Sequence, residues 1–404
     1  MKNAQDIIDM FNFLSTNHKN EISKLIEKGS TNTKDFYYNI GYDELCKQVV
    51  LLSKNVDFEN KLNIYKLILQ LTKLFKDGHT YWSFNDNRCL PFQIKFLKSE
   101  ADNNYGYYIT NNFTDKDILF NKVIKINGLD IDEVVDRIEK ITSGDSVAYV
   151  KSEAIKNLSC EKILRIVGVT PPYIFSLQNG NIFSEVELAA ERLALDKIYG
   201  GVKYYSTKDF VNQNQLIFKN ENNKGAYYSI KQVAENIFGM SICRFKQDEN
   251  YLLKQFYEDI NALIKDEQFV IIDLRENFGG HSIVSRHIAQ ILIDKKTSGY
   301  ILVNGGTMSA SIVMTEMLQK NGFITVGTAT GNAPIWFGGS YSVKIDDFGT
   351  FTTSQTIFDM TKVFGNTVVI MPNVIFENSI EDYKNGSDKQ LEFCLKKLSQ
   401  TTKK

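Results

Sequence analysis

The stretch Gln268-Phe269-Val270-Ile271-Ile272-Asp273-Leu274-Arg275-Glu276-Asn277-Phe278-Gly279-Gly280 decides the fold of the C-terminal half of the chain. Its first part is almost wholly apolar, which is typical of a strand buried on both faces of a parallel sheet. Two glycines close the loop, and a helical pattern follows. Glycines at such a crossing let backbone N–H groups face a bound group with no Cβ in the way. A tight turn that needs positive φ would explain them equally well.

The same strand-to-helix pattern recurs on both sides of this stretch. Strand patterns cover 299–304 and 323–329, each next to a helical pattern, and further strands are expected at 224–230 and 240–245. Helical patterns cover 247–265, 282–293, 309–322 and, as a closing amphipathic helix, 387–400. Strands that alternate with helices predict an α/β layer with parallel pairings.

The crossing at 303–311 places serines at the start of a helix. A serine there is ordinarily an N-cap. It can also be a nucleophile at the positive end of the helix, with the next amide free to stabilise an oxyanion. Ser309 and Ser311 both suit the cap, and the local pattern does not distinguish them.

Three blocks together resemble the S41 serine peptidases, which include the tail-specific (C-terminal processing) and tricorn-core peptidases. The blocks are DLRENFGG (273–280), NGGTMSAS (304–311) and ITVG (324–327), in that family's order and at similar separations. The resemblance implies a core of ClpP/crotonase-like character and a serine endopeptidase that cleaves a polypeptide through an acyl-enzyme. It implies Ser309 as nucleophile and backbone oxyanion donors at Gly279, Gly280 and Ala310.

The resemblance also bears on the general base. The tail-specific branch uses a lysine shortly after the Val-Gly strand, but Thr330-Gly331-Asn332 stands there, and no lysine lies between Lys320 and Lys344. The tricorn-like branch uses a histidine from the N-terminal region, in a block that Asp77-Gly78-His79-Thr80 matches. The resemblance therefore implies His79 as base.

The chain has four histidines, so the alternatives are few. His281 follows Gly280 directly and is the second choice for the base. We expect His18 to be solvated and His287 to have a surface or packing role. Asp77 and Ser354 could orient the His79 ring, and the sequence does not choose between them.

The chain divides into three predicted units, which make a mixed, multi-domain α/β fold. Residues 1–84 form a helical region, 85–200 a β-rich domain and 201–404 the α/β catalytic core. The strand–Asn-Gly–helix pattern that begins at Asn121 resembles part of a PDZ domain, although an unspecialised β-rich insert fits it as well.

The amino-acid composition limits the kinds of partner and cofactor that we expect. A net charge of -1 over 404 residues gives no basic field for nucleic acid. Five scattered cysteines without a CxxC pair suggest reduced thiols, and neither a metal nor a cofactor is implied. We see no signal peptide and no membrane span, which favours the cytoplasm, although a secreted chain trimmed of its leader would look the same. The composition leaves room for a homo-oligomer.

A rival function belongs to another class. An S41-like protein without activity could serve as a peptide- or ligand-binding module, because a fold does not fix a function. The missing lysine and the unassigned orienting residue favour this rival, whereas the intact blocks around Ser309, Gly279 and His79 disfavour it. We expect Asp273 and Arg275 to fix their loop by ion pairing, and Trp82 and Trp336 to be packing aromatics.

Overall fold

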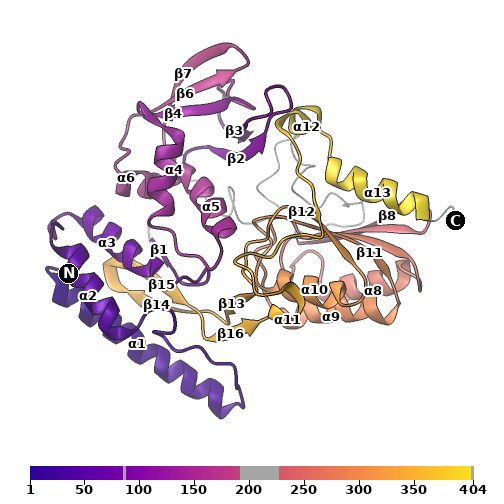
Figure 1. The fold of residues 1–404 in the computed structure, drawn as a ribbon, viewed down its shortest axis with the longest axis horizontal. Helices are drawn as coiled ribbons and strands as arrows, with labels where there is room; N and C mark the ends of the chain where they lie inside the picture. The colour runs from indigo at the N-terminus through magenta and orange to yellow at the C-terminus, as the bar shows by residue number, and fades with distance from the viewer. Residues whose placement is uncertain (85–87, 192–226, 402–404) are drawn as a thin grey trace.

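The computed structural model describes residues 1–84, 88–191 and 227–401. It has the predicted mixed α/β class, with several separate sheets (Figure 1). The predicted unit boundary at 200 lies outside the described residues, and the one at 84 stays a prediction. Within the described ranges, no helix combines the length and the apolar character that crossing a membrane requires.

Three helices form the N-terminal end: α1 (Ala4–Glu27), α2 (Tyr42–Ser53) and α3 (Lys61–Lys73). The Asn3 side chain caps α1 by accepting hydrogen bonds from the Gln5 and Asp6 amides. The buried face of α1 repeats every three or four residues, and His18 is its last member. The expectation that His18 is solvated is therefore wrong. Its ring is buried, and Nε2 lies 3.1 Å from the Ser354 carbonyl oxygen.

An antiparallel sheet follows, in the strand order β2-β3-β4-β6-β7, with β5 paired to β4. Its strands are β2 (Phe92–Lys98), β3 (Tyr105–Asn112), β4 (Lys122–Ile126), β5 (Leu129–Asp130), β6 (Tyr173–Asn179) and β7 (Ile182–Leu188). The helices between them are α4 (Ile131–Glu139), α5 (Val147–Lys156) and α6 (Glu161–Ile166). One continuous apolar cluster joins this sheet to the N-terminal helices.

The core sheet of the C-terminal half has the order β17-β12-β11-β10-β9-β8. The strands from β9 to β17 are parallel, and only β8 is antiparallel to its neighbour. This confirms the predicted parallel pairings. The strands are β8 (Tyr228–Ala234), β9 (Ile237–Ile242), β10 (Phe269–Asp273), β11 (Ser298–Val303), β12 (Ile324–Gly327) and β17 (Val374–Ile375).

Helices cover both faces of this sheet, which explains why β10 is apolar up to its last residue, Asp273 (Figure 1). Val270 and Ile272 face one cluster, and Ile271 between them faces the other. The helices of the first face are α8 (Leu253–Leu263), α9 (Ser282–Asp294) and α10 (Ala310–Gln319). The helix α13 (Lys389–Thr401) covers the second face. Burial on both faces removes the need for a polar side chain along the strand.

Two small sheets lie apart from the large ones, and the first joins the segment before β2 to the C-terminal half, a pairing that sequence patterns did not predict. The strand β1 (Tyr81–Ser83) pairs antiparallel with β15 (Gly349–Thr353), so that Trp82 lies opposite Phe351. The strand β14 (Tyr341–Ile345) completes that sheet, and β13 (Ile335–Gly338) pairs with β16 (Thr356–Asp359). In Figure 1 the orange β14 and β15 lie beside the indigo N-terminal helices, away from the core sheet. The short helices α11 (Thr361–Phe364) and α12 (Ile380–Asn385) complete the C-terminal half.

Candidate active site

Ser309 occupies the turn between β11 and α10 in a strained conformation. Its backbone has φ 60 and ψ −121, a combination that a residue with a Cβ rarely adopts. Ser309 stands at the N-cap position, yet its side chain makes no capping hydrogen bond, and it stays partly exposed. The ordinary role of a serine at a helix start therefore does not account for this residue, and its hydroxyl remains available for chemistry.

Ser311 makes a different set of contacts. It is fully buried in the first turn of α10, and its hydroxyl donates a 2.7 Å hydrogen bond to the Asn277 carbonyl oxygen. This bond ties α10 to the loop that follows β10. The two serines that the sequence could not separate thus differ in the structure: Ser311 is committed to a structural bond and Ser309 is not.

The backbone of Ser309 is held by Asn332, which sequence reasoning did not identify. The Ser309 amide donates to Asn332 Oδ1 over 2.6 Å, and Asn332 Nδ2 donates to Asp145 Oδ2 over 2.8 Å. Asn332 is fully buried, in the loop where the tail-specific branch would carry its lysine. Burial raises the pKa of the Asp145 carboxyl to about 7, and its Oδ1 has no hydrogen-bond partner within the described part of the chain.

The glycine loop after β10 lies directly against the serine. Gly279 has φ 89, and a Cβ on it would lie 2.6 Å from the Ser309 Cβ and 2.9 Å from the Ala310 nitrogen. Only glycine fits so close an approach. The Gly279 amide donates 2.8 Å to Asn277 Oδ1. Within the described ranges no hydrogen bond occupies the amides of Gly280 and Ala310, so these two of the three predicted donors keep a free N–H.

Asn277 organises this loop from a fully buried position. Besides holding the Gly279 amide, its side chain donates to the Ile242 carbonyl over 2.8 Å. Its own carbonyl accepts from the Met308 amide and from the Ser311 hydroxyl. Asn277 thus holds the glycine loop through its side chain and the turn that carries Ser309 through its backbone carbonyl.

His79 is placed by the pairing of β1 with β15 and by a buried network beneath it. The Asp77 carboxylate accepts from the His79 amide at 2.8 Å, the Lys34 ammonium at 2.7 Å and the Thr80 hydroxyl at 2.6 Å. The Ser354 hydroxyl donates to the same carboxylate. Burial opposes ionisation of Asp77, but the Lys34 charge outweighs it, and the pKa of Asp77 lies below its ordinary value. This network holds the His79 backbone rigidly.

The His79 ring contacts another aromatic ring. It stacks on the indole of Trp336, with ring centroids 5.9 Å apart and planes inclined by 27°. Nδ1 is buried and has no hydrogen-bond partner among the described residues. Burial lowers the pKa of His79 below its ordinary value of 6.5, so the ring is neutral at neutral pH. Asp77 and Ser354, the two residues considered as orienting groups, contact the backbone and the carboxylate beneath it rather than the ring.

The turn that carries His79 lies against the turn that carries Ser309. A Cβ on Gly78 would lie 3.4 Å from Met308 Cε and 3.0 Å from Asp145 Oδ1. Trp336, which stacks on His79, packs in one apolar cluster with Ile312 and Val313 of α10. The residues that precede His79 and Ser309 thus meet, although 230 positions separate the two in the sequence.

The other histidines lie elsewhere. His281 is exposed at the start of α9, where its amide donates to the Phe245 carbonyl oxygen over 2.7 Å. His287 is exposed on α9 and packs edge-on against Tyr257, which confirms its predicted surface or packing role. Within the ranges that the structure describes, no group of three or more His, Cys, Asp or Glu side chains is arranged to hold a metal.

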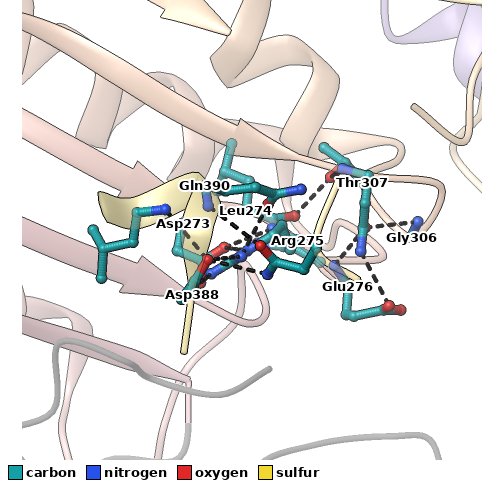
Figure 2. Close-up of polar contacts among 12 residues, drawn as sticks. Asp273, Leu274, Arg275, Glu276, Gly306, Thr307, Asp388 and Gln390 are labelled. Atoms are coloured by element: carbon teal, nitrogen blue, oxygen red, sulfur yellow. Dashed lines mark hydrogen bonds and ion pairs between the residues drawn. The ribbon is translucent and has the colours of Figure 1, made fainter. Parts of the chain in front are cut away.

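Asp273 and Arg275 form the predicted ion pair at the end of β10. Arg275 contacts both Asp273 oxygens at 2.9 Å, and it also pairs with Asp388 at 2.7 Å and with Gln390 at 2.9 Å (Figure 2). Asp388 lies just before α13, so this buried cluster ties the closing helix to the loop that leads to Gly279. Trp82 and Trp336 are both buried packing aromatics, as predicted, and Trp336 also contacts the His79 ring.

Comparison with known proteins gives the fold. No protein-family model and no curated protein sequence matches this chain. Mature CPAF superposes with a TM-score of 0.60 at 12% identity, over 92% of this chain and 94% of that chain. Mature CPAF complexed with lactacystin superposes with a TM-score of 0.63 at 11% identity, over 95% of this chain and 98% of that chain. The photosystem II D1 C-terminal processing protease superposes with a TM-score of 0.41 at 12% identity, over 88% of this chain and 92% of that chain. The chain has the fold of mature CPAF.

Proposed function

We propose that this chain, with its S41-like peptidase fold, is a serine endopeptidase that cleaves polypeptides through an acyl-enzyme. The observation that carries the proposal is the strained, uncapped Ser309 beside the glycine loop. Strain of this kind costs about 1–3 kcal/mol and persists where the surrounding structure enforces it, commonly at active sites. A serine with only a structural role would relax toward ordinary N-cap geometry.

In this mechanism His79 is the general base. Its neutral ring takes the Ser309 proton as Oγ attacks the scissile carbonyl carbon. The amides of Gly280 and Ala310 donate to the oxygen that becomes negative. His79 then returns the proton to the leaving amine, the C–N bond breaks, and the acyl-enzyme remains. Water, activated by the same ring, hydrolyses that ester and restores Ser309.

One observation favours the rival function, a catalytically inactive peptide-binding protein. The buried Nδ1 of His79 has no hydrogen-bond partner within the described part of the chain, whereas a working base is normally oriented by a third group. Stacking on Trp336 fixes the plane of the ring but not its tautomer. A peptidase of this design is therefore expected to be slow unless substrate binding supplies a partner.

Labelling with a fluorophosphonate probe separates the two functions, because the probe reacts only with an activated serine hydroxyl. We expect stoichiometric modification of the intact chain, with the adduct located on Ser309 by peptide mass spectrometry. Absence of an adduct, together with binding of unmodified peptides, would establish the rival function.

The pH profile of kcat/KM is expected to rise with pH through a midpoint below 6.5 and to level off by neutral pH. The base must be neutral, and burial lowers the pKa of His79, so the active form predominates from mildly acidic pH upward. Asp145, with a pKa of about 7, titrates nearby, and Asp145→Asn serves as the control because it removes that titration while an amide oxygen can still accept from Asn332. A midpoint near the lysine value of about 10.4 would contradict a histidine base.

Asn332→Ala is expected to lower kcat by about 10- to 100-fold with little change in KM, since a lost buried hydrogen bond costs about 1–3 kcal/mol. The substitution frees the Ser309 amide and so loosens the strained turn. Asn332→Asp keeps an acceptor for that amide but faces Asp145 with a second carboxylate, so its activity relative to the unmodified chain should fall as pH rises.

The matched control is Asn321→Ala, at an exposed turn position just after α10, which should leave kcat and the pH profile unchanged. Equal rates for Asn332→Ala and Asn321→Ala would show that Asn332 does not position the nucleophile.

A further inference from the structure

A cavity of about 330 Å³ lies between the antiparallel sheet and the core. One wall is made by β2 and α5, and the opposite wall by the loops that follow β10 and β11. Phe96, Phe278 and Tyr383 supply its aromatic surface. This volume lies at the lower end of the range for small-molecule sites, which suits a single side chain or chain end better than a cofactor.

The cavity is rich in positive charge. Five cationic side chains and two carboxylates line it: Lys95, Lys151, Lys156, Arg244, Arg275, Glu276 and Glu377.

Three of these cations have carboxylates within ion-pair distance. Lys95 and Lys156 share Glu276 at 3.0 and 3.8 Å, and Arg275 is neutralised by Asp273 and Asp388. For Arg244 and Lys151 there is no ion pair with any residue that the structure describes. The Lys151 ammonium instead lies 3.7 Å from the centre of the Phe96 ring.

Of these two cations, Arg244 has the larger unmet need for hydrogen-bond acceptors. Its guanidinium carbon lies 4.9 Å from the Phe278 ring centre, and the Lys156 ammonium lies 3.7 Å from the same centre. Its five N–H donors make no hydrogen bond within the described ranges, and burial lowers its pKa. A partly desolvated guanidinium without hydrogen-bond acceptors is costly, and a carboxylate that accepts two parallel hydrogen bonds would satisfy it.

The cavity adjoins the glycine loop that follows β10. Phe278 lines it and directly precedes Gly279, which lies against Ser309. Gly305 and Gly306, in the turn that leads to Ser309, line it as well. An extended chain advances about 3.3 Å per residue, so a polypeptide cut at Ser309 would pass this cavity within a few residues of the scissile bond.

We infer that this cavity is a subsite for a carboxylate of the polypeptide substrate, with Arg244 as its principal ligand and Lys151 as its second. The inference rests on the proposed peptidase function for the direction of the chain. A carboxylate has two sources in a polypeptide: an aspartate or glutamate side chain near the cut bond, or the free end of the chain. Both present the same planar group to the guanidinium.

The test is equilibrium binding of fluorescent peptides to the full chain carrying Ser309→Ala, which prevents turnover. One set of peptides carries Asp or Glu in place of Asn or Gln at each position in turn, and a second set compares a free with an amidated C-terminus. We expect one acidic position, or the free end, to tighten binding about 10- to 100-fold, and added salt to weaken that preference. Whichever set shows the preference identifies the source of the carboxylate.

Arg244→Gln, added to Ser309→Ala, is expected to abolish the preference for the carboxylate. Arg244→Lys should retain part of that preference, because the charge remains but the planar pair of N–H donors is lost. The matched control is Arg286→Gln, an exposed arginine on α9 away from the cavity, which should bind like the parent. Equal affinity for acidic and neutral peptides, or an equal effect of Arg286→Gln, would overturn the inference.

The peptide comparison uses the unaltered cavity, so it gives an answer even where an Arg244 variant fails to fold. Its failure can also be told apart from a failure of the proposed function. Fluorophosphonate labelling of Ser309 without a carboxylate preference would refute the subsite alone, whereas a preference without labelling would leave the subsite in an inactive binding protein.

Discussion

Ser309→Ala is expected to abolish fluorophosphonate labelling and to reduce peptide hydrolysis by about 10⁵- to 10⁶-fold, because removal of the nucleophile stops acyl-enzyme formation. The fold should persist, since the Ser309 side chain makes no capping hydrogen bond. Alanine is still a residue with a Cβ, so the strained backbone cost remains the same. Hydrolysis of a quenched fluorescent peptide measures the rate, and thermal unfolding checks the fold.

Ser311→Ala is the matched control, two residues further along the same helix. It should retain labelling at Ser309 while losing about 1 kcal/mol of unfolding free energy, since its buried hydroxyl bonds the Asn277 carbonyl. Loss of labelling in Ser311→Ala with its retention in Ser309→Ala would mean that the nucleophile has been assigned to the wrong serine.

His79→Ala should lower kcat/KM by about 10³-fold or more, because serine and base act as a unit. His79→Gln fills more of the space beside Trp336 and should be equally inactive, which separates loss of the base from loss of packing. The rate of fluorophosphonate labelling should fall in parallel with hydrolysis in both variants. Single-turnover kinetics on a peptide ester would show whether formation of the acyl-enzyme is the affected step.

The surface histidines provide the controls for this experiment. His287→Ala should behave as the unmodified chain, since its ring packs on Tyr257 at the outer face of α9. His281→Ala tests the second choice for the base. Full activity in both His79→Ala and His281→Ala would exclude both imidazoles and would require a lysine base, contrary to the histidine-using branch of the resemblance.

The parallel core was predictable because its signals are local. The apolar run at 269–272 is typical of a strand covered on both faces, and helical patterns lie directly before and after it in the sequence. The glycines at 279–280 and the serine at 309 each lie at a strand-to-helix crossing, and parallel strands bring such crossings to one edge of a sheet. Sequence order therefore implied that the glycine loop and Ser309 would meet.

The surroundings of the histidine were not predictable in the same way. The strands β13 to β16 are short, and their residues lie far from β1 in the sequence. The solvated role expected for His18 failed because a polar residue at the end of an apolar helix face is buried when its ring finds a carbonyl partner, here Ser354. Local polarity reports the average behaviour of a residue type and not the partner that tertiary packing supplies.

The mixed α/β class, the parallel pairings of the core and the ion pair of Asp273 with Arg275 could be predicted from the sequence, because their signals are local patterns in the chain. Tertiary contacts, in contrast, set which serine hydroxyl makes no capping hydrogen bond, which asparagine holds the Ser309 amide, and which cations of the cavity have no ion pair among the described residues. Those properties depend on hydrogen bonds and ion pairs between residues from different elements. Their formation depends on distances and angles that a one-dimensional pattern does not contain.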